Sequence, residues 1–67
     1  MINTNKIKAR IVELGMNQGD VAEEMKLAQP TLSQKLNNIR AMDLEEAEKL
    51  SKILEIPAEE FCNYFFA

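Results

Sequence analysis

The chain has 67 residues, a net charge of −3 and a sequence pI near 4.8. This length allows one small domain, which buries only roughly 60% of its unfolded surface. The content of 46% hydrophobic and 28% charged residues is typical of a globular chain and excludes a disordered or fibrous one. No apolar run approaches the ~20 residues of a membrane span, and the N-terminus lacks a signal-peptide core, so we expect a cytoplasmic protein without membrane contact.

The residue types also limit the chemistry. The chain has one cysteine, Cys62, and no histidine, which excludes an internal disulfide, a zinc quartet and a Cys/His nucleophile pair. A glycine-rich phosphate loop is also missing. We therefore predict no catalytic residue, no metal, no cofactor and no small-molecule ligand, and hence no enzyme. Cys62 is expected to be a small buried apolar group.

The charges are unevenly divided along the chain. Residues 1–42 hold six basic and four acidic groups, for +2, whereas residues 43–67 hold two basic and seven acidic groups, for −5. One face of the protein could thus meet phosphate while the other meets solvent or a protein partner. The acidic groups could equally serve only to make the C-terminal half soluble.

The first predicted helix covers Thr4 to Leu14, where apolar residues recur at spacings of four and three. Gly15 supplies a left-handed stop. The basic residues of this segment lie mostly on the opposite side, where a solvated face is favoured over contact with a DNA backbone; they are Lys6, Lys8 and Arg10.

Two short helices joined by a tight turn are predicted between residues 17 and 38. The first begins at Asn17, whose side chain can cap the first turn, with Asp20 favourable at the positive helix end. The second begins at Gln29 or Pro30, because proline is tolerated best in a first turn. Asn37 and Asn38 form its C-cap, since asparagine tolerates the left-handed conformation.

The outward positions of this second helix are nearly all small or amide-bearing, a set that suits base edges and phosphates. They are Gln29, Pro30, Thr31, Ser33, Gln34 and Lys35. The pattern of two helices and this outward face indicates a helix-turn-helix.

A loop follows, in which Ile39 and Met42 are expected to pin the chain to the core. Asp43 and Glu46 then match a capping box that opens a fourth helix. Its predicted apolar stripe is Leu44, Ala47, Leu50, Ile53 and Leu54. This helix should stop by Glu55 or Ile56, ahead of Pro57.

Pro57 opens a fifth, short helix, with Phe61 and Cys62 predicted to face inward. Residues 63–67 form an aromatic tail, which either folds back on the protein's own core or is buried against a second subunit. We favour the second arrangement for at least one aromatic, because exposed apolar clusters mark contact surfaces. The predicted dimer interface is Phe61, Tyr64, Phe65 and Phe66. With no repeat or linker visible, residues 1–67 are predicted to form one domain.

The stretch MNQGDVAEEMKLAQPTLSQKLNN, residues 16–38, resembles the helix-turn-helix of the phage repressor and Cro family, also called the XRE family. The resemblance extends over about residues 4–61. It implies an all-α, compact five-helix lambda-repressor-like domain that binds double-stranded operator DNA, commonly as a dimer.

The resemblance also implies roles for single residues. The positions that face bases are Gln29, Pro30, Ser33 and Gln34. Those that contact the DNA backbone are Asn17, Gln18, Thr31, Lys35, Asn38 and Arg40. Gln18 could in addition brace the third helix. The chain departs from the family pattern in having Lys26 instead of glycine in the turn and Ala28 instead of a serine or threonine cap, each at a cost of order 1 kcal/mol.

These features predict a phage-type repressor or Cro-like transcription regulator that occupies a palindromic operator as a homodimer. In such a dimer two recognition helices lie about 34 Å apart along the duplex. The alternative is a small protein-interaction module, of the antitoxin or antirepressor kind, that presents its acidic half, Asp43 to Glu60, to a protein. A helical bundle with no DNA role would have the same core pattern.

Overall fold

The computed structural model describes residues 1–66, and Ala67, the last residue of the predicted tail, lies outside them. The helices are α1 (Thr4–Glu13), α2 (Gln18–Met25), α3 (Gln29–Leu36), α4 (Leu44–Ile53), the 3₁₀ turn η1 (Ala58–Glu60) and α5 (Phe61–Phe65). Residues 1–66 contain no strand. The prediction of an all-α fold with five helices is therefore confirmed.

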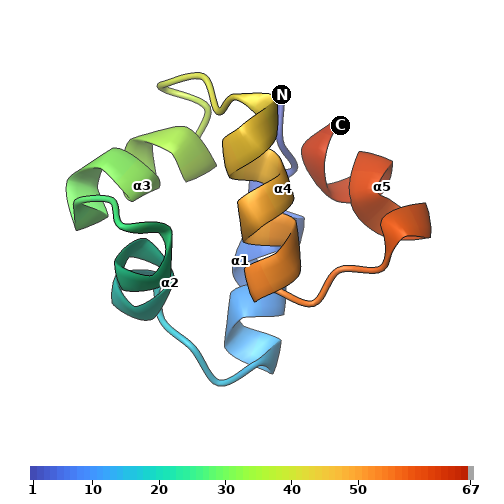
Figure 1. Cartoon of the computed structure of the whole chain (residues 1–67), viewed down its shortest axis with the longest axis horizontal. Coiled ribbons are helices and arrows are strands. Elements are labelled where there is room, and N and C mark those ends of the chain that lie inside the picture. The colour runs from blue at the N-terminus through green and yellow to red at the C-terminus, as the bar shows by residue number, and fades with distance from the viewer. Residues whose placement is uncertain (67) are drawn as a thin grey trace.

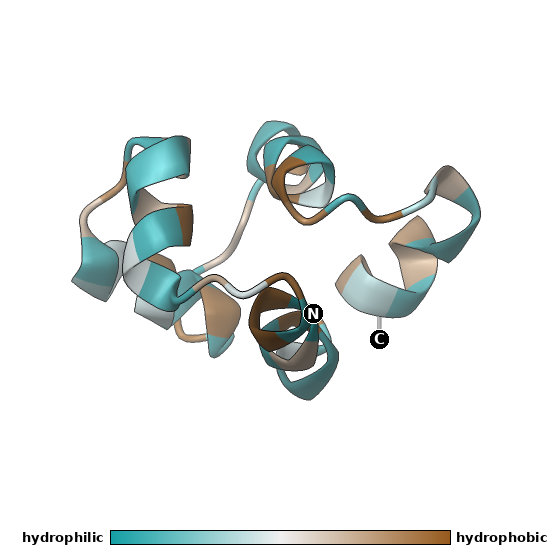
Figure 2. Cartoon of the chain, turned by 90° about the horizontal axis from the view of Figure 1, so that it is seen from below, coloured by the Kyte–Doolittle hydropathy of each residue, from teal (hydrophilic) through white to brown (hydrophobic). Residues whose placement is uncertain are grey.

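The helices surround one core within a body of 29 × 25 × 20 Å. Figure 1 shows α2 and α3 on one side of α4 and α1, and α5 on the other side. The buried side chains come from every α-helix, from Ile2 before α1 and from the loop after α4; the most deeply buried are Ile7, Val21, Leu32, Leu36, Leu50 and Leu54. Hydropathy alternates along the helices, as an amphipathic bundle requires (Figure 2). No helix among residues 1–66 is long and apolar enough to cross a membrane.

The predicted helix starts are confirmed by reciprocal hydrogen bonds. The Asp20 N–H donates to Asn17 Oδ1 at 2.8 Å, and the Asn17 N–H donates to Asp20 Oδ2 at 3.0 Å. The same capping box joins Asp43 and Glu46 at the start of α4. Each box satisfies two backbone N–H groups that the helix itself leaves without partners.

Among residues 1–66, four adopt the left-handed conformation. Gly15 at φ 71° and Asn38 at φ 60° end α1 and α3 as predicted. Lys26 adopts the same conformation at φ 58°, and Glu55, at φ 54°, follows α4. For these last two residues the conformation brings a steric cost that glycine would avoid.

Three predictions about buried side chains were wrong. Leu44 is 62% exposed because it is the first residue of α4, beyond the part of the helix that the other elements cover. Ile39 is 72% exposed, since the left-handed Asn38 turns the chain outward before it. Cys62 is exposed, because Tyr64 and Phe65 occupy the inward face of α5.

The aromatic tail divides between the core and the surface. Tyr64 and Phe65 are buried in the protein's own core, where Phe65 stacks on Phe61 with ring centroids 4.6 Å apart. Phe66 is 63% exposed. Of the four predicted interface residues, two are thus already covered within the protomer, and Phe66 offers the largest free aromatic surface.

Candidate nucleic-acid interface

The turn between α2 and α3 consists of Lys26, Leu27 and Ala28. The Lys26 N–H donates to the Glu23 carbonyl and the Leu27 N–H to the Ala22 carbonyl, at 3.1 and 2.9 Å. Leu27 packs against the core, whereas Lys26 and Ala28 are exposed. The turn is therefore held by backbone bonds and one apolar anchor, without the usual glycine.

The start of α3 lacks a side-chain cap, as the sequence predicted. Ala28 has the extended conformation of an N-cap but makes no side-chain hydrogen bond, and Pro30 lies in the first turn. Two fully buried leucines, Leu32 and Leu36, fix the inner face of the helix. This anchoring leaves the opposite side of α3 open to solvent.

The four residues predicted to face bases lie together on that side. Gln29 and Ser33 are four residues apart, as are Pro30 and Gln34, so the two pairs form adjacent rows on one helix face. Gln29, Pro30 and Gln34 are exposed, and Ser33 is half-buried. The strip carries no charge and offers two amides and one hydroxyl, which can donate and accept hydrogen bonds.

The N-terminus of α2 approaches the same strip. A Cβ atom at Gly19 would lie 3.1 Å from Asn17 Oδ1 and 3.5 Å from Gln29 Oε1. The contact with Gln29 would be an ordinary van der Waals one, whereas the contact with Asn17 Oδ1 would be tight, so a side chain at position 19 would crowd the cap of α2. Asn17 Oδ1 is occupied as the cap of α2. Gln18 and Thr31 are half-buried, and no hydrogen bond within residues 1–66 joins Gln18 to α3 as a brace.

Asn38 uses its side-chain amide within the protein. Its Oδ1 accepts from the Ile2 N–H at 3.0 Å, and its Nδ2 donates to the Ile2 carbonyl at 3.1 Å and to Thr4 Oγ1 at 3.3 Å. The Thr4 hydroxyl in turn donates to the Leu36 carbonyl at 2.6 Å. The side chain predicted to meet the DNA backbone therefore ties the N-terminal segment to the end of α3.

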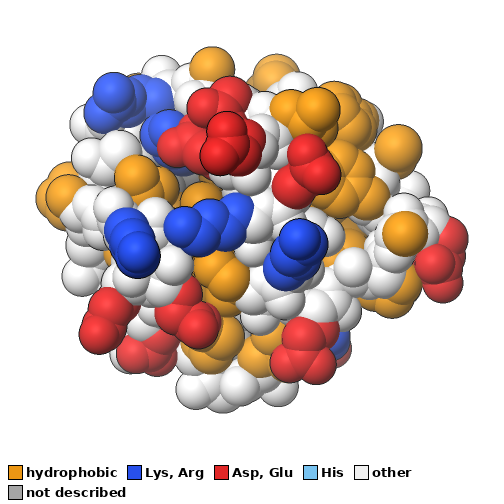
Figure 3. Space-filling view, in the orientation of Figure 1, with side chains coloured by type: hydrophobic (Ala, Val, Ile, Leu, Met, Phe, Trp, Pro, Cys, Tyr) orange, Lys and Arg blue, Asp and Glu red, His pale blue; other side chains and the backbone are white. Residues whose placement is uncertain are grey.

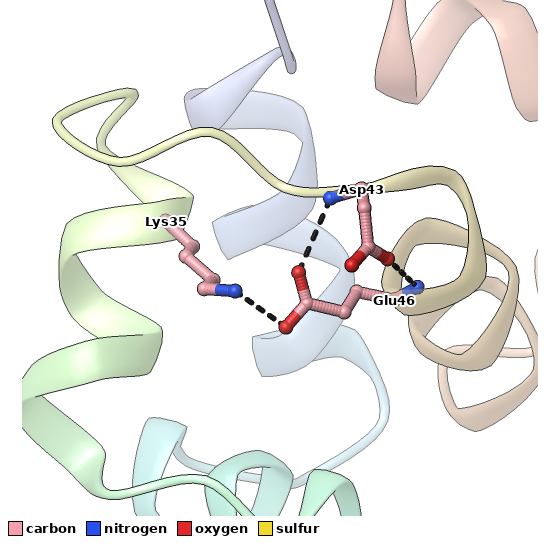
Figure 4. Close-up of polar contacts among 3 residues, drawn as sticks. All are labelled: Lys35, Asp43 and Glu46. Atoms are coloured by element: carbon pink, nitrogen blue, oxygen red, sulfur yellow. Dashed lines mark hydrogen bonds and ion pairs between the residues drawn. The ribbon is translucent and has the colours of Figure 1, made fainter.

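Lys35 also has a partner inside the protein. Its ammonium forms a hydrogen-bonded ion pair with Glu46 of α4, and the two side chains are 12% and 22% exposed. Figure 4 shows the lysine reaching from α3 towards the start of α4. The predicted backbone contact of Lys35 would require this pair to break.

The guanidinium of Arg40 has no partner within residues 1–66. Arg40 is exposed in the loop after α3, where its backbone N–H donates to the Gln34 carbonyl at 3.2 Å. Within the described part of the chain its side chain makes no hydrogen bond or ion pair. Of the six residues predicted to contact the DNA backbone, Arg40 is the one with a free positive charge.

The basic residues of α1 are occupied elsewhere. The Lys6 ammonium lies 5.0 Å from the centroid of the Tyr64 ring, and Lys8 donates to Asn37 Oδ1 at 3.1 Å. Arg10 donates to the carbonyls of Leu54 and Glu55 at the end of α4, at 2.9 and 3.3 Å. Figure 3 shows basic and acidic side chains interspersed over the face in view. The basic groups of α1 are therefore engaged within the protein, whereas the guanidinium of Arg40 is free within residues 1–66.

The family comparison agrees with this geometry. The Helix-turn-helix family model matches residues 7–61, which include α2, its turn and α3. No curated protein and no solved structure matches the chain. Because the match covers most of the chain, the protein belongs to the XRE-type helix-turn-helix family of DNA-binding transcription regulators.

Proposed function

We propose that the protein is a phage-type repressor or Cro-like regulator that occupies a palindromic operator as a homodimer. The observation that carries this proposal is the uncharged polar strip of α3, which is exposed beside the N-terminus of α2. An α-helix fits the major groove of B-DNA, and amide side chains there distinguish one base pair from another.

Base recognition is assigned to Gln29, Pro30, Ser33 and Gln34. A glutamine amide can bond both N6 and N7 of adenine, and such a bidentate contact contributes roughly 1–3 kcal/mol of discrimination. Gln34 is exposed at the C-terminal end of the strip, and we propose it as the main reader. Pro30 supplies an apolar surface that suits a thymine methyl group.

Contacts with the DNA backbone are assigned to both ends of the strip. Asn17, Gln18 and Thr31 provide polar groups near the start of α2 and α3, and Arg40 provides a charge beyond the end of α3. Phosphate contacts fix the register of a protein on the duplex and account for most of its salt dependence. Asn38 contributes by holding the end of α3.

Dimerisation is assigned to the exposed aromatic end of the chain. Phe66 lies 5.9 Å from Phe61 between ring centroids and lines a hollow together with Met1 and Met42. Met1 is 81% exposed and adds apolar surface beside Phe66, while Lys35, Asn38 and Arg40 line the polar side of the same hollow. A single recognition helix buries little surface and pairs few phosphates, whereas a symmetric pair doubles both. Tyr64 and Phe65 support this surface from the core.

The test is selection of bound duplexes from a random pool. We expect a palindromic consensus whose half-site centres lie about 10 base pairs apart. Affinity should fall steeply as salt rises, because phosphate contacts release counterions. Absence of binding to any duplex at about 50 mM salt would contradict the proposal and favour the protein-interaction module instead.

A further inference from the structure

Lys35 is the one charged residue of α3, and it points away from the solvent-exposed strip. Its side chain extends to the first turn of α4, where it meets Glu46 (Figure 4). With side-chain exposures of 12% and 22%, both partners are largely removed from water. An ion pair in such a place is screened much less by salt than one on the open surface.

Glu46 is also held by a contact that does not involve Lys35. One carboxylate oxygen accepts from the Asp43 N–H at 3.1 Å as part of the capping box, and the other faces the Lys35 ammonium. The carboxylate therefore has a fixed orientation at the start of α4. Withdrawing the lysine towards a phosphate would leave this half-covered carboxylate without its counter-charge, which is strongly unfavourable.

We infer that Lys35 is a positioning residue of the recognition helix, and that it acts through Glu46 without binding a phosphate. Lys35 lies between Gln34 and the buried Leu36 in the chain. The ion pair therefore fixes the rotation of α3 against α4, and with it the direction in which the Gln34 side chain projects. The salt-dependent phosphate contacts are then made by the exposed cations that flank α3, which are Lys26 and Arg40. This inference rests on the proposed role of α3 in reading bases.

The variant Glu46→Gln separates positioning from phosphate binding by the sign of its effect. Glutamine also serves in a capping box, so the start of α4 is kept while the charge partner of Lys35 is lost. If Lys35 served phosphate, freeing its ammonium and removing a negative charge would tighten DNA binding. Positioning requires weaker binding instead: we expect affinity for the selected consensus duplex to fall about fivefold, with affinity for a random duplex unchanged or slightly higher.

The matched control is Glu45→Gln, which makes the same charge change one residue earlier in α4. Glu45 is exposed and makes no ion pair within residues 1–66. We expect this control to leave the preference for the consensus over the random duplex unchanged.

Lys35→Met supplies the second measurement, because methionine keeps most of the aliphatic stem. We expect about the same fivefold loss on the consensus duplex, and no further loss when Glu46→Gln is added. The slope of log affinity against log salt should stay unchanged, whereas Arg40→Ala should reduce its magnitude by about 1.8, because the homodimer loses one phosphate contact in each subunit. Circular dichroism checks that each variant is folded, and Lys35→Gln replaces Lys35→Met if it is not.

Two results would overturn the inference alone: tighter consensus binding by Glu46→Gln, or a slope whose magnitude falls by about 1.8 in Lys35→Met. A wild-type protein that binds no duplex at about 50 mM salt would overturn the proposed function, and this inference with it. A failure of the positioning role can thus be distinguished from a failure of the proposed function.

Discussion

Asn38 and Ile2 are joined by two hydrogen bonds, one in each direction. The Ile2 N–H donates to Asn38 Oδ1 at 3.0 Å, and Asn38 Nδ2 donates to the Ile2 carbonyl at 3.1 Å. The two residues are 36 positions apart in the chain. The Asn38 side chain thus bonds both the N–H and the carbonyl of Ile2, as a neighbouring strand would do. These two bonds attach the N-terminal segment to the end of α3.

The substitution Asn38→Ala is expected to lower the free energy of unfolding by about 2 kcal/mol, because both bonds are lost and alanine is strained at φ 60°. Asn38→Gly should cost only about 1 kcal/mol, since glycine accepts this conformation. Urea denaturation measures both values. Asn63→Ala, at an exposed site of α5, is the control, and equal losses for all three variants would contradict the assignment.

Lys26→Gly is expected to stabilise the protein by about 0.5–1 kcal/mol, because glycine removes the steric cost of the left-handed turn between α2 and α3. The greater freedom of glycine in the unfolded chain reduces this gain. The same change at Lys49, an exposed position inside α4, should destabilise by about 1 kcal/mol. Thermal unfolding compares the two variants, and a loss of stability in Lys26→Gly would refute the strain argument.

Gln34→Ala should weaken binding to the selected consensus duplex by about 1–3 kcal/mol and leave binding to random DNA nearly unchanged. The reason is that a lost base contact removes discrimination, whereas the phosphate contacts remain. Fluorescence anisotropy measures both affinities. Asn5→Ala, on the exposed side of α1, serves as control. Equal loss on both duplexes would show that Gln34 reads no base.

Phe66→Ala is expected to shift the monomer–dimer equilibrium towards the monomer, because Phe66 is 63% exposed and lines a hollow together with Met1 and Met42. If Phe66 is one of the few residues that carry most of the binding energy, its truncation costs about 2 kcal/mol or more. Sedimentation velocity over a concentration series gives the dissociation constant. Truncation after Cys62 is a poorer test, since it also removes Tyr64 and Phe65 from the core.

For the Phe66 prediction, Val12→Ala supplies the control. Val12 is 74% exposed on α1, so its loss removes a comparable isolated apolar side chain away from the tail. An unchanged dimer, or an unchanged monomer, in Phe66→Ala would exclude the tail from the interface.

Features that depend on neighbouring residues could be predicted from the sequence. The capping box of Asp43 and Glu46 and the Asn17 cap of α2 follow from residue types within three or four positions. So do the left-handed stop at Gly15 and the uncapped start of α3. The all-α fold follows from the helical spacing of its apolar residues. Local patterns of this kind survive folding because their partners are already adjacent in the unfolded chain.

The partners of the polar side chains could not be predicted in this way. Arg10 donates to Leu54 from 44 residues away, and Lys35 meets Glu46 from a different helix. The sequence spacing shows which face a side chain occupies, but the group opposite that face depends on how the helices pack. The same reason explains Cys62 and Leu44, which lie at helix positions that no other element covers.

The amide groups of Ile2 and Asn3 are bonded to two different helices, so their hydrogen exchange measures two different local opening events. Chain ends usually fray, and their amide protons then exchange rapidly with solvent. Here the Ile2 N–H is bonded to the end of α3, and the Asn3 N–H donates to the Tyr64 carbonyl of α5 at 2.7 Å. Deuterium uptake at two adjacent amides therefore follows the detachment of two different helices: α3, which we propose to meet DNA, and α5 at the aromatic end.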